Sequence, residues 1–211
     1  TYCLRVVHHD GSLLDTYSVY PEITTSDGAF GGDIVDGSGN PVASPNVTMS
    51  TVSTGFSCLT ATGTLGTASQ RLRVTNRSAS YPWSLSIAAT DGNTALWSNG
   101  SALYDFNDPS GSPPGCSAGA DSDTYAGLLS LLFGSASITP QSGCVSTGLS
   151  FGNNANFNEG TADSLTVSQA SSSAANGCYW DVEGIGLNQQ IPAAQPAGTY
   201  TLNLTLTLVA N

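Results

Sequence analysis

Apolar and polar residues alternate in several short runs of this chain, and this alternation constrains the fold more than any other feature. It is clear in QRLRVTN at residues 70–76 and in PWSLSIAAT at residues 82–90, and it is longest at residues 200–208, where Tyr and Leu alternate with Thr and Asn. A period of two places every second side chain on the same face of a β strand. The runs therefore predict strands with one buried face, and the first two runs predict an antiparallel pair.

The composition favours many short strands joined by turns. The 211 residues include 24 Gly and 10 Pro but one Met and no Lys, whereas a helical protein of this size would use Lys, Glu, Leu and Met. The segment at 125–133, followed by Ser137, Ile138 and Thr139, predicts a strand pair or at most a short helix. We expect an all-β fold, a β-sandwich of jelly-roll or immunoglobulin-like type at residues 31–211, preceded by an extended N-terminal arm at residues 1–30.

Five cysteines lie far apart in the sequence. No C-x-x-C pair is present, which argues against a zinc ribbon or a redox motif and favours disulfides formed in an oxidising compartment. One cysteine must remain outside two disulfides. Several pairings are compatible with the spacing, and we favour Cys116 with Cys144, and Cys58 with either Cys3 or Cys178.

The charge of the chain excludes two classes of partner. The net charge is −11, with four Arg and no Lys, so the chain cannot neutralise a run of phosphates, and we expect no nucleic-acid or anionic-membrane partner. No apolar stretch is long enough to span a membrane, and the first residues do not read as a leader peptide. We expect a processed, secreted protein located at the cell surface.

An acidic, Pro- and Gly-rich segment is the best candidate for a metal site. Calcium takes six to eight oxygen ligands, and carboxylates close to loop carbonyls can supply them. An alternative interpretation is that the same residues only form turns. The five candidate calcium ligands are Asp105, Asn107, Asp108, Asp121 and Asp123.

The residues needed for catalysis are not grouped in the sequence. His8 and His9 are adjacent, so on a strand they would point to opposite faces, and no G-x-S-x-G nucleophile motif accompanies them. The three glutamates, Glu22, Glu159 and Glu183, are widely spaced, and turnover abolished by Glu159→Gln or Glu183→Gln would be the evidence for a secreted hydrolase. We expect no enzymatic activity.

Three tryptophans could form a platform that stacks on sugar rings. Trp83, Trp97 and Trp180 each lie in or beside an alternating run, so we expect at least two of them to pack in the core. Trp97, with Tyr104 and the acidic segment, is the candidate ligand surface of a monomeric adhesin or carbohydrate-binding module that contacts glycans.

The absence of Lys limits how such a protein can polymerise. Isopeptide cross-links need a lysine amine, so the remaining route for a secreted β protein is strand addition, in which a segment of one subunit completes a sheet edge of the next. The arm holds two apolar stretches, at residues 2–7 and 13–20. Its candidate subunit contacts are Leu4, Val6, Leu13, Leu14, Tyr17 and Val19.

Several motifs carry a resemblance to a known class of proteins. The segments QRLRVTNRSASYPWSLSI, YDFND, DSD, SASITP and WDVEG, followed by IPAAQPAGTYTLNLTLTL, resemble secreted bacterial β-sandwich surface proteins. The last segment is similar to the closing strand of spore-coat-U-like pilins and of WxL-like cell-surface domains. The resemblance covers residues 70–211 and implies an extracellular structural or adhesive role, with strand complementation between subunits. The second W-x-L signature is absent, so attachment to peptidoglycan is not implied.

These observations lead to one main functional hypothesis. We expect the repeating subunit of an extracellular filament or pilus, a homopolymer assembled by strand complementation and stabilised by disulfides and calcium. The alternative is the monomeric adhesin or carbohydrate-binding module.

Overall fold

The computed structural model describes residues 5–6, 30–77, 82–119 and 123–211, with residues 5 and 6 placed by their backbone. Within these residues the chain forms strands and turns and contains no α-helix. The prediction of an all-β sandwich is confirmed. The boundary between an arm and the sandwich stays a prediction, and the first strand after the arm begins at Phe30.

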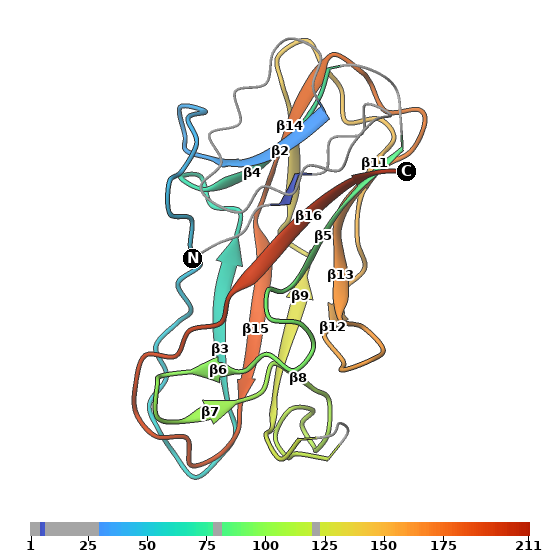
Figure 1. The fold of residues 1–211 in the computed structure, drawn as a ribbon. Helices are drawn as coiled ribbons and strands as arrows, with labels where there is room; N and C mark the ends of the chain where they lie inside the picture. The colour runs from blue at the N-terminus through green and yellow to red at the C-terminus, as the bar shows by residue number, and fades with distance from the viewer. Residues whose placement is uncertain (1–4, 7–29, 78–81, 120–122) are drawn as a thin grey trace.

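Three sheets and one short hairpin make up the described fold (Figure 1). The first sheet has the order β1 (Arg5–Val6), β16 (Leu204–Ala210), β5 (Trp83–Ala89), β13 (Ser164–Ala170) and β11 (Leu149–Phe151). The second has the order β10 (Ser137–Pro140), β14 (Cys178–Glu183), β4 (Arg71–Asn76) and β2 (Phe30–Val35). The third has the order β12 (Ala155–Asn156), β9 (Gly127–Leu132), β15 (Ile185–Ile191) and β3 (Leu59–Leu65), with β8 (Asn107–Asp108) paired to β9. The hairpin consists of β6 (Trp97–Ser98) and β7 (Leu103–Tyr104).

The second and third sheets form one bent layer opposite the first sheet. Figure 1 shows β14 continuing into β15, and Gly184 lies between these two strands. The Gly184 N–H donates to the carbonyl oxygen of Gly66 over 2.7 Å, and both glycines have positive φ, at 77° and 76°. A Cβ on Gly66 would lie 2.7 Å from the Val182 carbonyl oxygen. The bend therefore requires glycine at both positions.

The core lies between the two layers and draws on the inward face of each strand. In β4, Leu72 and Val74 are buried, and in β5 Leu85 and Ile87 are buried. Trp83 of β5 and Trp180 of β14 contact each other across the core, with ring centroids 6.1 Å apart, and they are 1% and 0% exposed. Two of the three tryptophans are thus core residues, as the alternation predicted.

The structure corrects the predicted pairing of the first two alternating runs. Both runs are strands, β4 and β5, but they do not form an antiparallel pair: β4 lies between β14 and β2, and β5 lies between β16 and β13. The two strands belong to different sheets. Alternation shows which face of a strand is buried but does not identify the neighbouring strand in the sheet. The predicted pairing of β4 with β5 was wrong for this reason.

Two further segments differ in extent from their predictions. Residues 127–132 and 137–140 are both strands, β9 and β10, and not a helix, but they do not pair with each other: β9 pairs with β8, β12 and β15, and β10 pairs with β14. The closing run begins as a strand at Leu204 rather than at Tyr200. Before Leu204 the chain makes an isolated bridge between Thr201 and Ser98, which redirects it away from β5.

Candidate functional site

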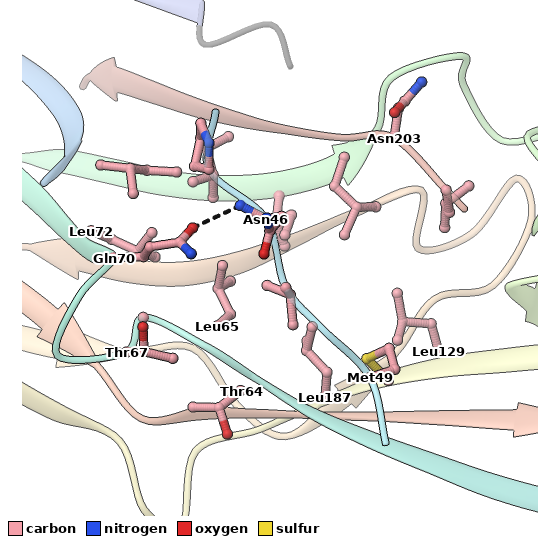
Figure 2. Close-up of a pocket in the computed structure, with 18 of the residues that line it drawn as sticks. Asn46, Met49, Thr64, Leu65, Thr67, Gln70, Leu72, Leu129, Leu187 and Asn203 are labelled. Carbon is pink, nitrogen blue, oxygen red and sulfur yellow. Dashed lines mark hydrogen bonds between the residues drawn. The ribbon is translucent and has the colours of Figure 1, made fainter. Parts of the chain in front are cut away.

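An apolar groove opens between the two layers at the edge formed by β16 and β3. Its volume is about 530 Å³, within the range of ligand-binding clefts. Figure 2 shows side chains that converge on it from strands far apart in the sequence. Its floor consists of core residues from both layers: Leu65, Leu72, Ile87, Leu129, Leu187 and Leu206.

One rim of the groove is an extended segment, residues 45–49, that follows the outer edge of β3. Ser50 N–H donates to the Thr62 carbonyl oxygen over 2.6 Å, and this bond holds the end of the segment against β3. A Cβ on Gly63 would lie 2.5 Å from the Met49 sulfur, so glycine in the middle of β3 permits the close approach. Further along, Gln70 Oε1 accepts the Asn46 backbone N–H over 2.7 Å (Figure 2).

The opposite rim is the outer edge of β16 together with residues 200–203. The Thr90 N–H donates to the Asn203 carbonyl oxygen over 2.9 Å, and the Asn211 N–H donates to the Pro82 carbonyl oxygen over 2.7 Å. These bonds mark the odd-numbered residues of β16 as the ones bonded to β5, because an antiparallel strand directs the main-chain groups of alternate residues to alternate edges. The N–H and C=O groups of Leu204, Leu206 and Leu208 therefore face the outer edge.

This outer edge of β16 has one strand partner within the described residues. β1 pairs with it in parallel, with Arg5 opposite Thr207 and Val6 opposite Leu208. The stretch from Leu204 to Leu206, beside the groove, has β5 as its only strand partner in this part of the chain. A sheet edge above an apolar groove, with no further strand partner among the described residues, is chemically suited to bind an extended peptide.

Three aromatic rings form a cluster beside the groove, which Trp97 and Tyr200 line. Trp97 stacks on Tyr104 with ring centroids 5.9 Å apart and an interplanar angle of 12°, and Tyr200 packs against Tyr104 with centroids 5.0 Å apart. The Trp97 Nε1 donates to Gln189 Oε1 over 2.8 Å. Burial raises the pKa of the Tyr104 hydroxyl well above its ordinary value. Trp97 and Tyr104 thus pack against each other, and the indole N–H is already bonded within the protein.

The acidic segment predicted to bind calcium begins at β8. Asp105, Asn107 and Asp108 are buried there. Asp108 accepts the Ser110 N–H on Oδ1 and the Gly119 N–H on Oδ2, both over 2.8 Å. Asp105 Oδ1 accepts the Phe106 N–H over 2.6 Å. These carboxylates hold the backbone of the loop in place.

The second half of the predicted calcium site is only partly described. Asp123 Oδ1 accepts the Tyr125 N–H over 2.6 Å, and Asp121 lies outside the described residues. Within the described ranges, no three His, Cys, Asp or Glu residues are grouped so that they could hold a metal ion. Calcium binding at this loop stays a prediction, which titration with calcium would test.

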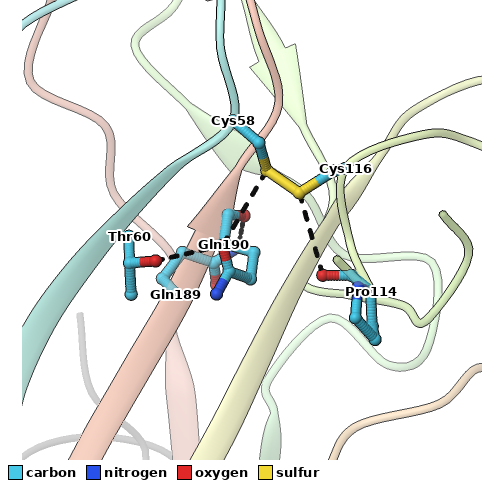
Figure 3. Close-up of a disulfide and its surroundings, with 6 residues drawn as sticks. All are labelled: Cys58, Thr60, Pro114, Cys116, Gln189 and Gln190. Carbon is cyan, nitrogen blue, oxygen red and sulfur yellow. Dashed lines mark hydrogen bonds between the residues drawn. A yellow bond between two sulfur atoms is a disulfide. The ribbon is translucent and has the colours of Figure 1, made fainter. Parts of the chain in front are cut away.

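Two disulfides join four of the five cysteines. Cys58 is bonded to Cys116 and Cys144 to Cys178, so the favoured pairing of Cys116 with Cys144, and of Cys58 with Cys3 or Cys178, was wrong. Figure 3 shows the Cys58–Cys116 bond joining the start of β3 to the Pro- and Gly-rich loop. Sequence spacing could not select among the pairings, because the folding of the layers brings the partners together. Two disulfides indicate an oxidising compartment.

A charged cluster covers the outward face of β4 and β14, away from the groove. Arg73 forms two hydrogen bonds with Asp181, at 2.7 and 2.9 Å, and Arg71 forms a third at 3.1 Å. The Arg73 guanidinium also lies 3.9 Å from the centroid of the Tyr179 ring. Asp181 raises the pKa of Arg73 through these bonds. Because the cations are neutralised within the protein, this face is not a free anion site.

Most of the predicted subunit contacts lie outside the described residues. This holds for Leu4, Leu13, Leu14, Tyr17 and Val19, and for the histidine pair His8 and His9. For Val6 the backbone is described, in β1. The groove could not be predicted from the sequence, because its residues come from many segments. The alternating leucines before and within β16 were the one sequence signal for it.

Comparisons with protein-family models, with curated protein sequences and with solved structures gave no significant match to this chain. A search for membrane spans in the described ranges identified no helix with the length and apolarity needed to cross a bilayer.

Proposed function

We propose that this protein is a structural subunit of an extracellular filament, assembled when the N-terminal arm of one copy adds a strand to the sheet edge of the next. The observation that carries the proposal is the apolar groove beside the outer edge of β16. Main-chain groups of Leu204 and Leu206 face this edge, and apolar side chains of both layers form the floor below it. Strand addition uses these two features together.

The arm has the chemistry that such a groove would accept. Its second apolar stretch, residues 13–20, is eight residues long, and an extended segment of that length spans about 26 Å at about 3.3 Å per residue. The rim from Tyr200 to Leu206 is seven residues long, about 23 Å by the same rise. Alternate side chains of the donor would enter the groove, while its backbone would bond to β16.

The proposal assigns the protein a mechanical role outside the cell. The two disulfides favour an oxidising, extracellular setting, and the filament would be a homopolymer whose partners are identical subunits. No catalytic step is part of this role. The aromatic cluster of Trp97 and Tyr104 would support the wall of the groove rather than act as a sugar platform, because the two rings stack on each other.

Deletion of residues 1–20 tests the proposal. Of the described strands, residues 1–20 contain β1 alone, which pairs with β16 over two residues, so the shortened chain should fold with a thermal midpoint close to that of the full chain. Negative-stain electron microscopy should show filaments for the full chain and discrete particles for the shortened one. Filaments of unchanged length and number from the shortened chain would overturn the role of the arm.

A further inference from the structure

The strand β1 belongs to the same chain as the edge that it covers. Arg5 and Val6 pair in parallel with Thr207 and Leu208, next to the stretch of β16 that borders the groove. β1 thus covers the end of the very edge to which a neighbouring subunit would add its strand. In Figure 1 this short strand lies beside the long β16.

One strand edge can pair with only one partner at each position. The outward main-chain groups of β16 belong to Leu204, Leu206 and Leu208, and pairing with β1 engages this edge at its Leu208 end. A donor strand of eight residues that begins at Tyr200, the first residue of the rim, would extend to Thr207, which pairs with Arg5. It would therefore need the positions that β1 occupies, so β1 and the donor cannot both be in place.

The two ways of covering the edge differ in strength. β1 contributes two residues in parallel pairing, which is slightly less stable per residue than antiparallel pairing. A donor strand would add a longer ladder and would also fill the apolar groove, so it would gain from burial as well as from hydrogen bonds. A short strand can therefore protect the edge of a free subunit from unspecific pairing and still yield to the donor.

We infer that β1 is a detachable cap, by which each free subunit covers its own acceptor edge until the residue 13–20 stretch of a second copy displaces it. This inference rests on the proposed function and divides the arm between two tasks. Arg5 and Val6, in the first apolar stretch, pair within the subunit. The second stretch pairs with the neighbour.

The cap itself is tested at a protein concentration at which sedimentation velocity shows the full chain as a monomer. Amide hydrogen exchange of the full chain should show the Leu208 N–H protected and the Leu204 N–H exchanging faster. The double variant Arg5→Pro and Val6→Pro fixes φ of both residues near −65°, away from the extended value of a parallel strand, and removes their N–H groups, so β1 should no longer pair with β16 or offer a carbonyl oxygen to the Leu208 N–H. The variant should raise the exchange rate of Leu208 to that of Leu204, while Thr207 and Val209, bonded to β5, stay unchanged. The matched control, Arg5→Ala with Val6→Ala, keeps the backbone donors and should retain the protection. Equal exchange of Leu208 in all three proteins would overturn the cap.

Competition is tested with a synthetic peptide of residues 11–21 as the probe. Its affinity for the full chain should be lower than for the double proline variant, by about tenfold if the cap is formed in about nine of ten molecules. Equal affinity for both chains would overturn the competition and leave the filament proposal standing. Binding to neither chain would overturn the filament proposal and this inference together, while the exchange of Leu208 would still report whether the cap exists.

Discussion

Leu206 of β16 lies opposite Ile87 of β5 in the antiparallel pair, and the two side chains form part of the groove floor. The same face of β16 continues to Leu204, which is half-buried at the rim. The inward face of one strand thus belongs both to the core of the subunit and to the surface that a donor strand would contact.

A substitution at Leu204 should prevent filament assembly while the subunit still folds. The variant Leu204→Glu places a charge in the groove and should abolish filaments, because an apolar donor side chain would have to bury that charge. Since Leu204 is half-buried in the subunit, we expect the free energy of unfolding to fall by only about 1 kcal/mol. Val209→Glu is the matched control: Val209 lies on the opposite face of β16 and is 39% exposed, and its variant should still form filaments. Electron microscopy and thermal unfolding distinguish the two variants.

Asp33 makes the folded state less stable as the pH rises, which is the reverse of the usual effect of a carboxyl group. Burial raises the pKa of its carboxyl above the ordinary value of 3.8, so ionisation costs the folded state more than the unfolded state. Stability from this group is therefore greatest at low pH and falls as the pH rises through 3.8 and then through the raised value. Asp33→Asn keeps an oxygen for the Ile34 N–H and should be more stable than the parent at pH 7. The difference should vanish below about pH 3.

Asp36 is the control for Asp33, because its pKa is shifted in the opposite direction. Hydrogen bonds from Asn40 lower the pKa of its carboxyl, so its contribution is present above pH 3.8 and is lost as the pH falls through the lowered value. Asp36→Asn should therefore be less stable than the parent at pH 7 and equal to it in strong acid. Urea unfolding at a series of pH values measures both variants. A gain in stability at pH 7 for both, or for neither, would contradict the account.

Asp181 holds the charged cluster on the outward face of β4. It is 3% exposed and accepts hydrogen bonds from both Arg71 and Arg73, so its removal would leave two partly buried cations without their shared anion. Asp181→Ala should lower the free energy of unfolding by about 2–3 kcal/mol, somewhat less than for a fully buried pair. Glu183→Gln should cost less than about 1 kcal/mol, because the Glu183 carboxylate lies 4.0 Å from Arg71 and is 27% exposed. Similar losses in the two variants, measured by urea unfolding, would refute this ranking.

The Cys58–Cys116 disulfide closes a segment of 58 residues and anchors the Pro- and Gly-rich loop to β3. Replacing both cysteines by serine should lower the free energy of unfolding by about 2–4 kcal/mol and expose residues 109–119 to proteolysis. Mass spectrometry of an unreduced digest should recover Cys58 linked to Cys116 and Cys144 linked to Cys178. A peptide in which Cys116 is linked to Cys144 would show that the described pairing is wrong.

The strands could be predicted from the sequence, but their partners could not. Leu72, Val74, Leu85 and Ile87 are buried as the alternation requires, because alternation is a local property of each strand. Whether β4 pairs with β5 depends on contacts between distant segments, and the sequence of either strand carries no record of them.

The groove illustrates the same limit at the functional site. The alternating leucines 202, 204, 206 and 208 predicted a strand with one buried face, which is correct from Leu204 onward. That the outer edge of this strand borders the groove, with β1 as its one strand partner among the described residues, depends on the bridge between Thr201 and Ser98 and on the position of residues 45–49 along β3. Gly63, which permits that position, reads in the sequence only as an interruption of a strand.

Mixing two variants that each lack one half of the subunit contact tests the central claim most directly. The chain without residues 1–20 keeps an acceptor groove but has no donor, and Leu204→Glu keeps the donor but has a blocked groove. Each alone should remain a monomer in sedimentation velocity, and a mixture should form a one-to-one heterodimer that grows no further. Filaments from either variant alone, or no complex in the mixture, would contradict assembly by strand addition into this groove.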